Sequence, residues 1–346
     1  MNDQWKQFLE SRSARIDDSG VRFPTAAAAP ACALTDLSHL GLIRVSGEDA
    51  DGFLQGQLTN DIREVTGGHW QLSGYCTPKG RLLASFLVFR RDGDLYLQTT
   101  AGLVAALIDR LRMFVLLSKV TIEDASDRLV RIGLAGDCAP ELLAGRFRQP
   151  PGASGGAVTE NGITLLRLGG ELPRYELIGD ARTVAGVWQQ LAEKAEPANA
   201  DYWSLLEIRA GVPSVQQETV EAFVPQMVNM ELIDGISFTK GCYTGQEVVA
   251  RMRYLGKLKR RMYLAHVDTD TCPRPGDAIH SPHSASGQGA GRVVDARPAP
   301  EGGCDLLVVL EIASREAGDL RLGDADGAEL RFPEQPYPLE QEQTSP

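Results

Sequence analysis

The sequence predicts an α+β protein that has two related subdomains of helices and strands, followed by a small β-barrel. Helix-like and strand-like segments alternate before Gly256, and their order returns once. After Gly256 the pattern changes to short strands punctuated by glycine and proline, which is typical of a small barrel or sandwich. A chain of 346 residues also has room for two or three domains. We therefore divide the chain into subdomains at 30–125 and 126–255, a barrel at 256–335 and a tail at 336–346.

The first predicted subdomain opens with a short apolar strand at residues 42–45. Ser46 is placed to cap a following helix. Glu48 and Asp49 would lie in the first turn of that helix, where the positive end of the helix dipole favours acidic groups. We therefore expect a strand that leads directly into a capped helix.

A hairpin, a second helix and a further strand complete this subdomain. Residues 82–89 and 95–99 have strand patterns, and the Asp-Gly pair between them at residues 92 and 93 is a hairpin signal. A strand is also expected at residues 120–122. Between the hairpin and that strand, apolar residues recur at helical spacing: Leu103, Leu107, Leu111 and Phe114.

The second predicted subdomain repeats this order. A loop rich in glycine and proline, residues 150–156, interrupts it. Its expected strands are 130–134, 163–168 and 175–178, and its expected helices are 140–144, 183–195 and 202–210.

The C-terminal barrel is predicted from five strand patterns: 259–267, 278–281, 291–295, 305–310 and 328–331. The segment from Pro333 to the C-terminus is polar and contains further prolines. We expect it to be disordered or loosely attached.

Charge and hydropathy exclude several classes of protein. The net charge of −11 argues against a protein that coats nucleic acid, so direct nucleic-acid binding is not expected. No stretch approaches the ~20 apolar residues of a membrane span. The N-terminus is acidic and polar, where a signal peptide would be basic and then apolar. We therefore expect a cytoplasmic protein with no membrane partner.

The cysteine pattern predicts neither disulfides nor a resident metal site. Six cysteines are scattered along the chain, with no CxxC pair and no Cys/His cluster at zinc spacing: Cys32, Cys76, Cys138, Cys242, Cys272 and Cys304. Disulfides are not expected in a cytoplasmic chain of this size. The chain is also poorly equipped to hold an iron–sulfur cluster alone, because a stable cluster normally takes four ligands.

The most informative segment is the run Lys240-Gly241-Cys242-Tyr243-Thr244-Gly245-Gln246-Glu247. Both glycines permit positive φ or a close approach of the backbone to a ligand. A helix can start after Gly245, which would put the nearby amides at an N-terminus that favours anions. Cys242, close to Lys240 and to this helix end, would then have thiolate character and react with oxidants and metals. The alternative, that Cys242 is a small buried hydrophobic residue, stays open.

These eight residues resemble the signature KGCYxGQE of the YgfZ family, which consists of folate-binding relatives of the glycine-cleavage T-protein. The match continues through Val249-Ala250-Arg251. Weaker matches lie upstream and bring the resemblance to roughly residues 34–309: Phe53-Leu54-Gln55-Gly56-Gln57-Leu58-Thr59, Lys79-Gly80-Arg81, Ala210-Gly211-Val212-Pro213 and Gly235-Ile236-Ser237-Phe238.

The resemblance implies a three-lobed, T-protein-like fold around a central opening that holds tetrahydrofolate or a related reduced folate. It also implies support for the assembly or repair of iron–sulfur clusters in client enzymes, including enzymes that modify transfer RNA. Cys242 would be a redox-active residue or a transient metal ligand, with Lys240 beside it. The folate-binding residues would be Trp203, Gly241, Tyr243, Gly245, Gln246, Glu247 and Arg251.

Two departures from related patterns bear on the chemistry. The T-protein pattern has an acidic pair where this chain has Gly80-Arg81-Leu82-Leu83-Ala84-Ser85, and aminomethyl transfer needs an acid or base against the folate nitrogen. The family also commonly has an acid before Ala-Gly, where this chain has Arg209, so the usual carboxylate contacts with the pterin are in doubt.

Several of these residues have a structural alternative. Trp203 and Tyr243 could stack on a pterin ring or could be core residues between lobes. A basic stripe could receive a folate glutamate tail, nucleic acid or an acidic partner, but a solvated surface is favoured: Arg251, Arg253, Lys257, Lys259, Arg260 and Arg261.

Three functional hypotheses follow. The first is a folate-binding accessory protein whose partners are iron–sulfur client enzymes bound transiently. The second is a folate-dependent aminomethyl or methyl transferase, against which the missing carboxylates count. The third is a non-catalytic scaffold with no affinity for folate.

Overall fold

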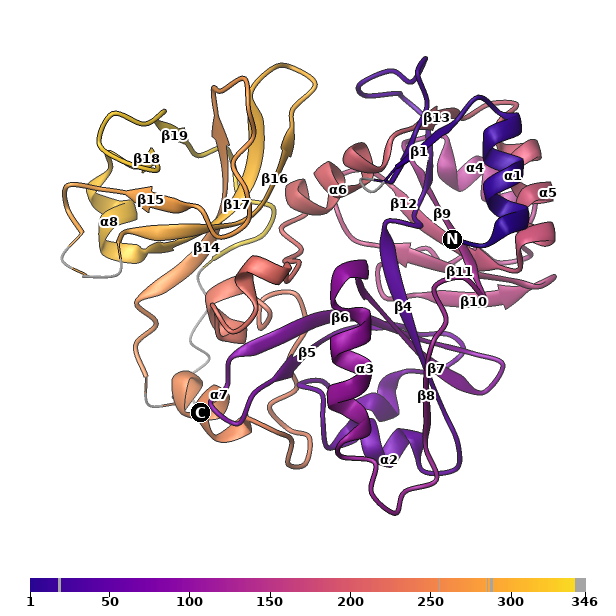
Figure 1. Cartoon of the computed structure of the whole chain (residues 1–346), viewed down its shortest axis with the longest axis horizontal. Helices are drawn as coiled ribbons and strands as arrows, with labels where there is room; N and C mark the ends of the chain where they lie inside the picture. Colours follow the sequence, from indigo (N-terminus) through magenta and orange to yellow (C-terminus); the bar gives the residue numbers. More distant parts are fainter. Residues whose placement is uncertain (18–19, 255, 285, 287–288, 340–346) are drawn as a thin grey trace. The chain divides into compact units, whose positions relative to one another are not determined.

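The computed structural model describes residues 1–17, 20–254, 256–284, 286 and 289–339 (Figure 1). The chain splits into two compact units. Unit 1 comprises Met1–Leu54, Ile62–Gln71 and Phe86–Ser204, and unit 2 comprises Gln55–Asp61, Leu72–Ser85 and Leu205–Pro346. The boundaries at residues 125, 255 and 335 stay a prediction.

The first sheet has five strands in the order β5-β6-β7-β4-β8. The turn between β6 and β7 contains Asp92 at φ 52° and Gly93 at φ 88°, the left-handed conformations that a tight hairpin needs, so the predicted hairpin is confirmed. The elements are β4 (Leu40–Ser46), α2 (Ala50–Gln55), η1 (Ile62–Glu64), β5 (Gln71–Cys76), β6 (Leu82–Arg91), β7 (Asp94–Thr100), η2 (Ala101–Leu103), α3 (Val104–Arg112) and β8 (Thr121–Asp124).

Two local predictions for this part are wrong. Ser46 is the last residue of β4 and α2 begins only at Ala50, so Glu48 and Asp49 precede the helix. The Asp49 carboxylate instead accepts a hydrogen bond from the backbone N–H of Lys119 at 2.7 Å. Phe114 lies beyond the end of α3 and is exposed, because the helix stops two residues earlier.

A six-stranded sheet in the order β10-β11-β12-β9-β3-β13 repeats this arrangement. The series β10-β11-β12-β9 corresponds to β5-β6-β7-β4, which confirms the two related subdomains. In the described part of this sheet β13 pairs with β3 in parallel, and the other neighbouring strands pair antiparallel. The elements are β3 (Ala33–Asp36), β9 (Val130–Ala135), α4 (Ala139–Ala144), β10 (Ala157–Glu160), β11 (Ile163–Leu168), β12 (Arg174–Gly179), α5 (Ala181–Leu191), β13 (Glu196–Ala198) and α6 (Ala200–Arg209).

An N-terminal helix, α1 (Asp3–Ser11), packs against α5 in unit 1, followed by the short pair β1 (Arg15–Asp17) and β2 (Gly20–Arg22). Trp5 is 1% exposed, and its indole N–H donates to the Asp36 carboxylate at 2.6 Å. Burial raises the pKa of Asp36 above its usual range. The sequence pattern did not predict this helix.

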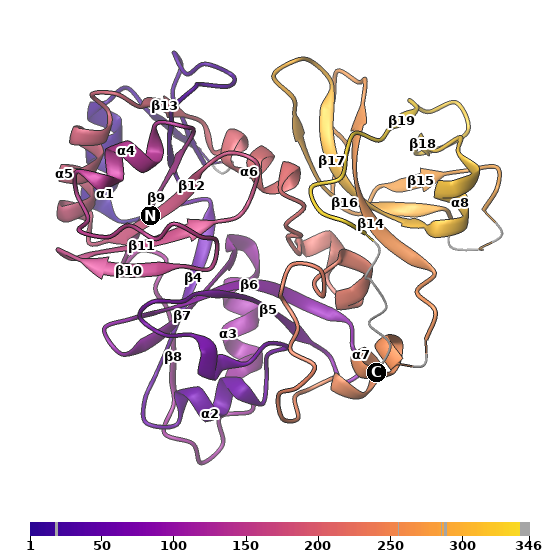
Figure 2. The same ribbon diagram turned by 180° about the vertical axis from the view of Figure 1, so that it is seen from behind.

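The C-terminal part of unit 2 is a six-stranded sheet in the order β18-β15-β16-β17-β14-β19. A bridge between Arg321 and Glu329 joins its two ends into a nearly closed barrel, as predicted (Figure 2). Its elements are β14 (Arg260–Val267), β15 (Ala278–His280), β16 (Gly291–Pro298), β17 (Cys304–Glu311), α8 (Ile312–Ala317), β18 (Arg321–Leu322) and β19 (Leu330–Arg331). Unit 2 also contains η3 (Gln217–Thr219), η4 (Pro225–Val228) and α7 (Gln246–Tyr254).

Two disulfides contradict the expectation that this chain has none. Cys32 is bonded to Cys138 with Cα atoms 5.8 Å apart, and Cys272 to Cys304 with Cα atoms 5.6 Å apart. The first pair meets because β3 pairs with β9, so that the residue before β3 approaches the start of α4. This pairing joins cysteines 106 residues apart, and sequence spacing does not reveal it.

The predicted loose tail is wrong for the residues up to 339. The side-chain amide of Gln335 exchanges two hydrogen bonds with the backbone of Leu264 in β14. The Tyr337 hydroxyl donates to the Gly211 carbonyl at 2.8 Å. Residues 340–346, the rest of the predicted tail, lie outside the described residues.

In the part of the chain that the structure describes, no helix combines the length and the apolar character that a membrane crossing requires.

Candidate functional site

Residues 240–247, called the signature loop below, form an irregular segment of unit 2 that leads into α7. Lys240 fixes its start. The Lys240 side chain is 5% exposed, and its Nζ donates to the backbone carbonyls of Gln55 at 2.8 Å, Leu58 at 2.7 Å and Asn60 at 2.8 Å. Gln55 ends α2, where the last carbonyls have no partner inside the helix. Lys240 therefore acts as an anchor, and a direct part in chemistry stays a prediction.

Tyr243 and Thr244 hold the middle of the signature loop. The Tyr243 side chain is 7% exposed, and Lys240 Nζ lies 5.2 Å from its ring centroid. Burial, with a smaller contribution from Cys76, raises the pKa of Tyr243. The Thr244 N–H donates to the Gly56 carbonyl at 3.3 Å. The loop is thus held on both sides of Cys242.

Gly245 is required by the packing of a neighbouring turn. It has φ +86°, and a Cβ at this position would lie 2.5 Å from the Thr77 carbonyl oxygen and 3.1 Å from the Gly80 Cα. The glycine prediction therefore holds at Gly245. Gly241 differs, since a Cβ there would meet nothing within 4 Å and its φ is not positive. Nothing in the described protein requires glycine at 241.

Two cysteines are free thiols among the described residues, and they differ in access. Cys242 is exposed, which removes the alternative of a small buried hydrophobic residue. Cys76 is buried at the end of β5, and burial raises its pKa to about 12. A Cβ on Gly245 would lie 3.2 Å from the Cys76 Cβ, so the signature loop covers Cys76.

This arrangement predicts selective thiol labelling. In the oxidised native protein we expect Ellman's reagent to modify Cys242 rapidly and Cys76 only on unfolding, because Cys76 is buried and its raised pKa leaves no thiolate near neutral pH. Denaturant alone should make both free thiols reactive. Denaturant together with a reductant should make all six cysteines reactive. Mass spectrometry of the labelled peptides measures each site. Rapid native labelling of Cys76 would contradict the packing described above.

The other predicted folate-binding residues lie either on α7 or in the core of unit 1. Gln246, Glu247 and Arg251 are on α7, where the side-chain amide of Gln246 donates to the Gly241 carbonyl at 3.4 Å, and Glu247 and Arg251 are exposed. Trp203 lies in unit 1 and is 1% exposed. Its ring packs on Gly133, where a Cβ would lie 2.3 Å from it. In this structure Trp203 is a core residue, and stacking on a pterin stays a prediction.

Residues 80–85, the stretch compared above with the T-protein acidic pair, contain no carboxylate. Leu83 and Ala84 are buried, and the Ser85 hydroxyl donates to the Pro213 carbonyl at 3.0 Å. This stretch therefore presents buried apolar side chains and a hydroxyl that is already hydrogen-bonded to the backbone.

Arg209 links α6 to the barrel instead of facing a ligand. Its guanidinium pairs with Asp305 at 2.7 Å and with Glu301 at 2.6 Å. His266 Nδ1 lies 2.7 Å from the other Asp305 carboxylate oxygen. Arg209 thus neutralises a largely buried carboxylate in β17.

Replacement of Arg209 by leucine is expected to lower the free energy of unfolding by about 1–3 kcal/mol, because Asp305 loses its guanidinium partner while it stays largely buried. Arg331→Leu is the matched control. Arg331 pairs with Asp268 on the exposed surface of the same barrel, so its loss should change stability by only about 0.5 kcal/mol. Urea unfolding measures both variants. Equal losses would show that the Arg209 pair has no special weight.

Buried glutamines supply a feature that the sequence pattern did not reveal. Gln71 is 6% exposed, and neither of its side-chain amide atoms has a hydrogen-bond partner among the described residues. The side-chain oxygen of Gln57 is likewise buried without one. Unpaired buried amides are costly and call for a partner outside the chain, such as water or a ligand. Gln71 lies in unit 1 and Gln57 in unit 2, and each offers an amide group that can match a donor or acceptor of a pterin edge.

Among the described residues, no three His, Cys, Asp or Glu side chains lie close enough together to hold a metal ion. Cys242 could therefore supply one ligand to a cluster whose other ligands come from elsewhere.

Comparison with known proteins defines first the class and then the family. Residues 7–234 match the family model described as "GCVT N-terminal domain". The fold is similar to that of glycine cleavage system aminomethyltransferase T from Bartonella henselae, with TM-score 0.72, 15% identity and 95% of each chain covered. The chain is thus a protein of the GcvT-like fold, and the T-protein-like architecture predicted above is confirmed.

Curated relatives make the family more specific. The chain is 36% identical to the "tRNA-modifying protein YgfZ" of Colwellia psychrerythraea (strain 34H) over 84% of this chain and 88% of the relative. It is 32% identical to the protein of the same name from Klebsiella pneumoniae (strain 342), over 92% of this chain and 97% of the relative. The chain belongs to the YgfZ family.

Proposed function

We propose that this protein is a folate-binding accessory protein that supports the assembly or repair of iron–sulfur clusters in client enzymes, including enzymes that modify transfer RNA. The relatives named as tRNA-modifying proteins support the last part of this proposal. The observation that carries it is the presentation of Cys242. This exposed thiol projects from a loop that is anchored on both sides by Lys240 and Tyr243.

A fixed, accessible thiol suits a transient ligand. Because the loop is held by buried groups, the thiol is presented without a large loss of conformational entropy when a client docks. The client would supply the remaining cluster ligands, since the described residues hold no group of three. The cluster is therefore cargo rather than a resident cofactor, and client enzymes are transient partners.

The folate would order the surroundings of the loop. Gln57, in the same compact unit as the signature loop, offers an unpaired side-chain oxygen to a pterin, and the exposed Arg251 of that unit offers a cation to the glutamate tail. A reduced folate supplies one-carbon chemistry when bound. Residues 80–85, compared above with the T-protein acids, hold no carboxylate, and the Ser85 hydroxyl is bonded to a backbone carbonyl, so an accessory role is favoured over aminomethyl transfer.

We also propose that the protein works in the cytoplasm. Thiols are kept reduced there, so the two disulfides would form only on oxidation. Cell fractionation together with thiol trapping in intact cells tests this placement. Protein recovered outside the cytoplasm with both disulfides formed would overturn it.

Two measurements test the function. Titration of the purified chain with tetrahydrofolate should give saturable binding. Calorimetry and the fluorescence of the four tryptophans measure it. Expression in a bacterial strain that lacks its own relative should restore the activity of an iron–sulfur enzyme that modifies transfer RNA. Folate binding without rescue would favour the transferase hypothesis. Turnover of an aminomethyl donor with tetrahydrofolate would then establish that activity. Absence of both would favour the scaffold.

A further inference from the structure

A surface of unit 1, far from the signature loop in sequence, exposes apolar side chains that the core does not use. Residues 113–117, called the apolar loop below, connect α3 to β8. Four of its side chains are exposed: Met113 at 63%, Phe114 at 43%, Leu116 at 86% and Leu117 at 100%. Across the residues that the structure describes, Tyr254 is the one other exposed large hydrophobic side chain. A contiguous exposed apolar group of this kind marks an interaction site.

The backbone of the apolar loop is built to hold these side chains outward. Successive turns close it, with the Phe114 N–H bonded to the Leu111 carbonyl at 3.0 Å and the Ser118 N–H bonded to the Val115 carbonyl at 2.8 Å. Leu116 has φ +44°, which is uncommon for a bulky residue and persists only where the surrounding structure determines it. The presented surface is therefore preformed.

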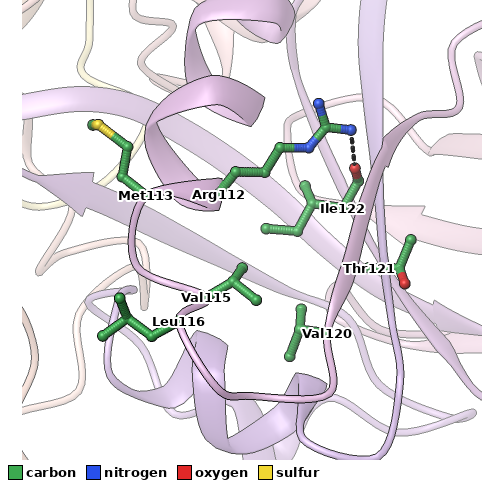
Figure 3. Close-up of a pocket in the computed structure, with 7 residues that line it drawn as sticks. All are labelled: Arg112, Met113, Val115, Leu116, Val120, Thr121 and Ile122. Atoms are coloured by element: carbon green, nitrogen blue, oxygen red, sulfur yellow. Dashed lines mark hydrogen bonds between the residues drawn. The ribbon is translucent and has the colours of Figure 1, made fainter.

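A hollow of about 510 Å³ lies beside the apolar loop (Figure 3). Arg112 is its single charged lining residue, and its guanidinium donates to the Ile122 carbonyl at 2.6 Å. This hydrogen bond fixes the guanidinium at the edge of the hollow, whose wall combines aliphatic side chains with exposed polar atoms. The remaining lining residues are Met113, Val115, Leu116, Val120, Thr121 and Ile122.

The charge beside the hollow indicates which partner fits. Arg110 and Arg112 make the last turn of α3 basic, and Arg112 is the one that lines the hollow. Arg112 is exposed and forms no ion pair among the described residues. A carboxylate from outside would pair with its guanidinium through charge-assisted hydrogen bonds. The complementary surface therefore combines an apolar side chain with aspartate or glutamate.

Other occupants fit less well. An anionic membrane would repel a chain of net charge −11, and a hollow receives a side chain rather than inserting into lipid. A second copy in a symmetric contact would present the same patch, whose charged lining residue is again the basic Arg112. A copy that presented Tyr254 would bring Arg251 and Arg253 with it, which is again basic. A different protein is favoured.

We propose that the apolar loop and its hollow are the docking surface for a partner protein that presents an apolar side chain flanked by carboxylates. The partner inserts the apolar side chain beside Val115 and Leu116, and a carboxylate pairs with Arg112. This interaction is independent of folate and of Cys242.

An apolar anion of similar chemistry, 8-anilinonaphthalene-1-sulfonate, probes the hollow in the full chain. We expect saturable binding that weakens about tenfold or more in Leu116→Asp and in Arg112→Gln, because each removes one of the two contacts. Aspartate tolerates the positive φ of residue 116, and both side chains are exposed, so the folds should survive. Tyr254→Ser is the matched control and should bind as the unaltered chain does. Equal affinity in all variants would overturn the proposal.

Photo-crosslinking in living cells tests the partner. A benzophenone amino acid at position 117 should link to a segment of another protein that has Asp or Glu within one helical turn of an apolar residue. The yield should fall about tenfold in Arg112→Glu, whereas the same probe at Arg148, which is 95% exposed, should give no such product. Links to a second copy, to lipid or to a segment without carboxylates would each overturn the proposal, as would no product above the control.

Discussion

Replacement of Cys242 by serine is expected to abolish rescue of a strain that lacks its own relative, to the level of an empty vector. Serine keeps the size and polarity of the side chain but is a far weaker ligand for iron and is not oxidised to a disulfide. Because Cys242 is exposed, the free energy of unfolding should change by only about 0.5 kcal/mol or less. The activity of the iron–sulfur enzyme and the urea midpoint of the purified variant measure the two effects separately.

Thr239→Ala is the matched control for this experiment. Thr239 is exposed and lies just before the signature loop, so its replacement alters the same surface without removing the thiol. It should keep full rescue. Tetrahydrofolate should still bind to Cys242→Ser, since Gln57, which is proposed to contact the pterin, is unchanged. Full rescue by Cys242→Ser would end the proposed role of the thiol while leaving folate binding intact.

The sequence predicted those features of the loop that depend on neighbours along the chain. The helix that starts at Gln246 and the positive φ of Gly245 are both local, and both are present. The burial of Lys240 was not predicted, because its three carbonyl partners lie about 180 residues away. A lysine in a loop normally faces solvent, and only the tertiary structure shows that this one is enclosed.

The same distinction explains the tryptophan and the disulfides. The interior position of Trp203 depends on Gly133, which leaves room for the ring in a strand far earlier in the chain. The Cys32–Cys138 bond depends on the pairing of β3 with β9. Neither partner has a distinctive sequence pattern. Long-range strand pairing decides these positions, and periodicity within one segment carries no information about it.

The apolar loop shows the opposite case. Phe114 continues the helical spacing of Leu103, Leu107 and Leu111, and this pattern predicted a helix that extends to it. The helix ends at Arg112 instead, and the chain turns outward with Leu116 at positive φ. The prediction assumes that apolar residues at helical spacing face the core, and Phe114 does not. Departures of this kind concentrate at functional surfaces.

The largest effect on the structure of the site is expected for Lys240→Met. Methionine keeps the length of the side chain but loses three hydrogen bonds to carbonyls, two of which are made in buried surroundings, so we expect the free energy of unfolding to fall by about 3–5 kcal/mol. Lys257→Met, at an exposed position, should change it by only about 0.5 kcal/mol.

A second readout separates release of the signature loop from general loss of stability. Tyr243 and Gly245 cover Cys76, so loosening the loop should let Ellman's reagent reach Cys76 in conditions where the Lys240→Met protein is still folded by circular dichroism. Rescue should fall even though Cys242 is present, because the thiol is no longer held in place. If Cys76 stays protected and rescue is complete, Lys240 serves only the stability of residues 55–60. If Cys76 becomes reactive and rescue is lost, the anchoring of the loop is what makes its thiol useful.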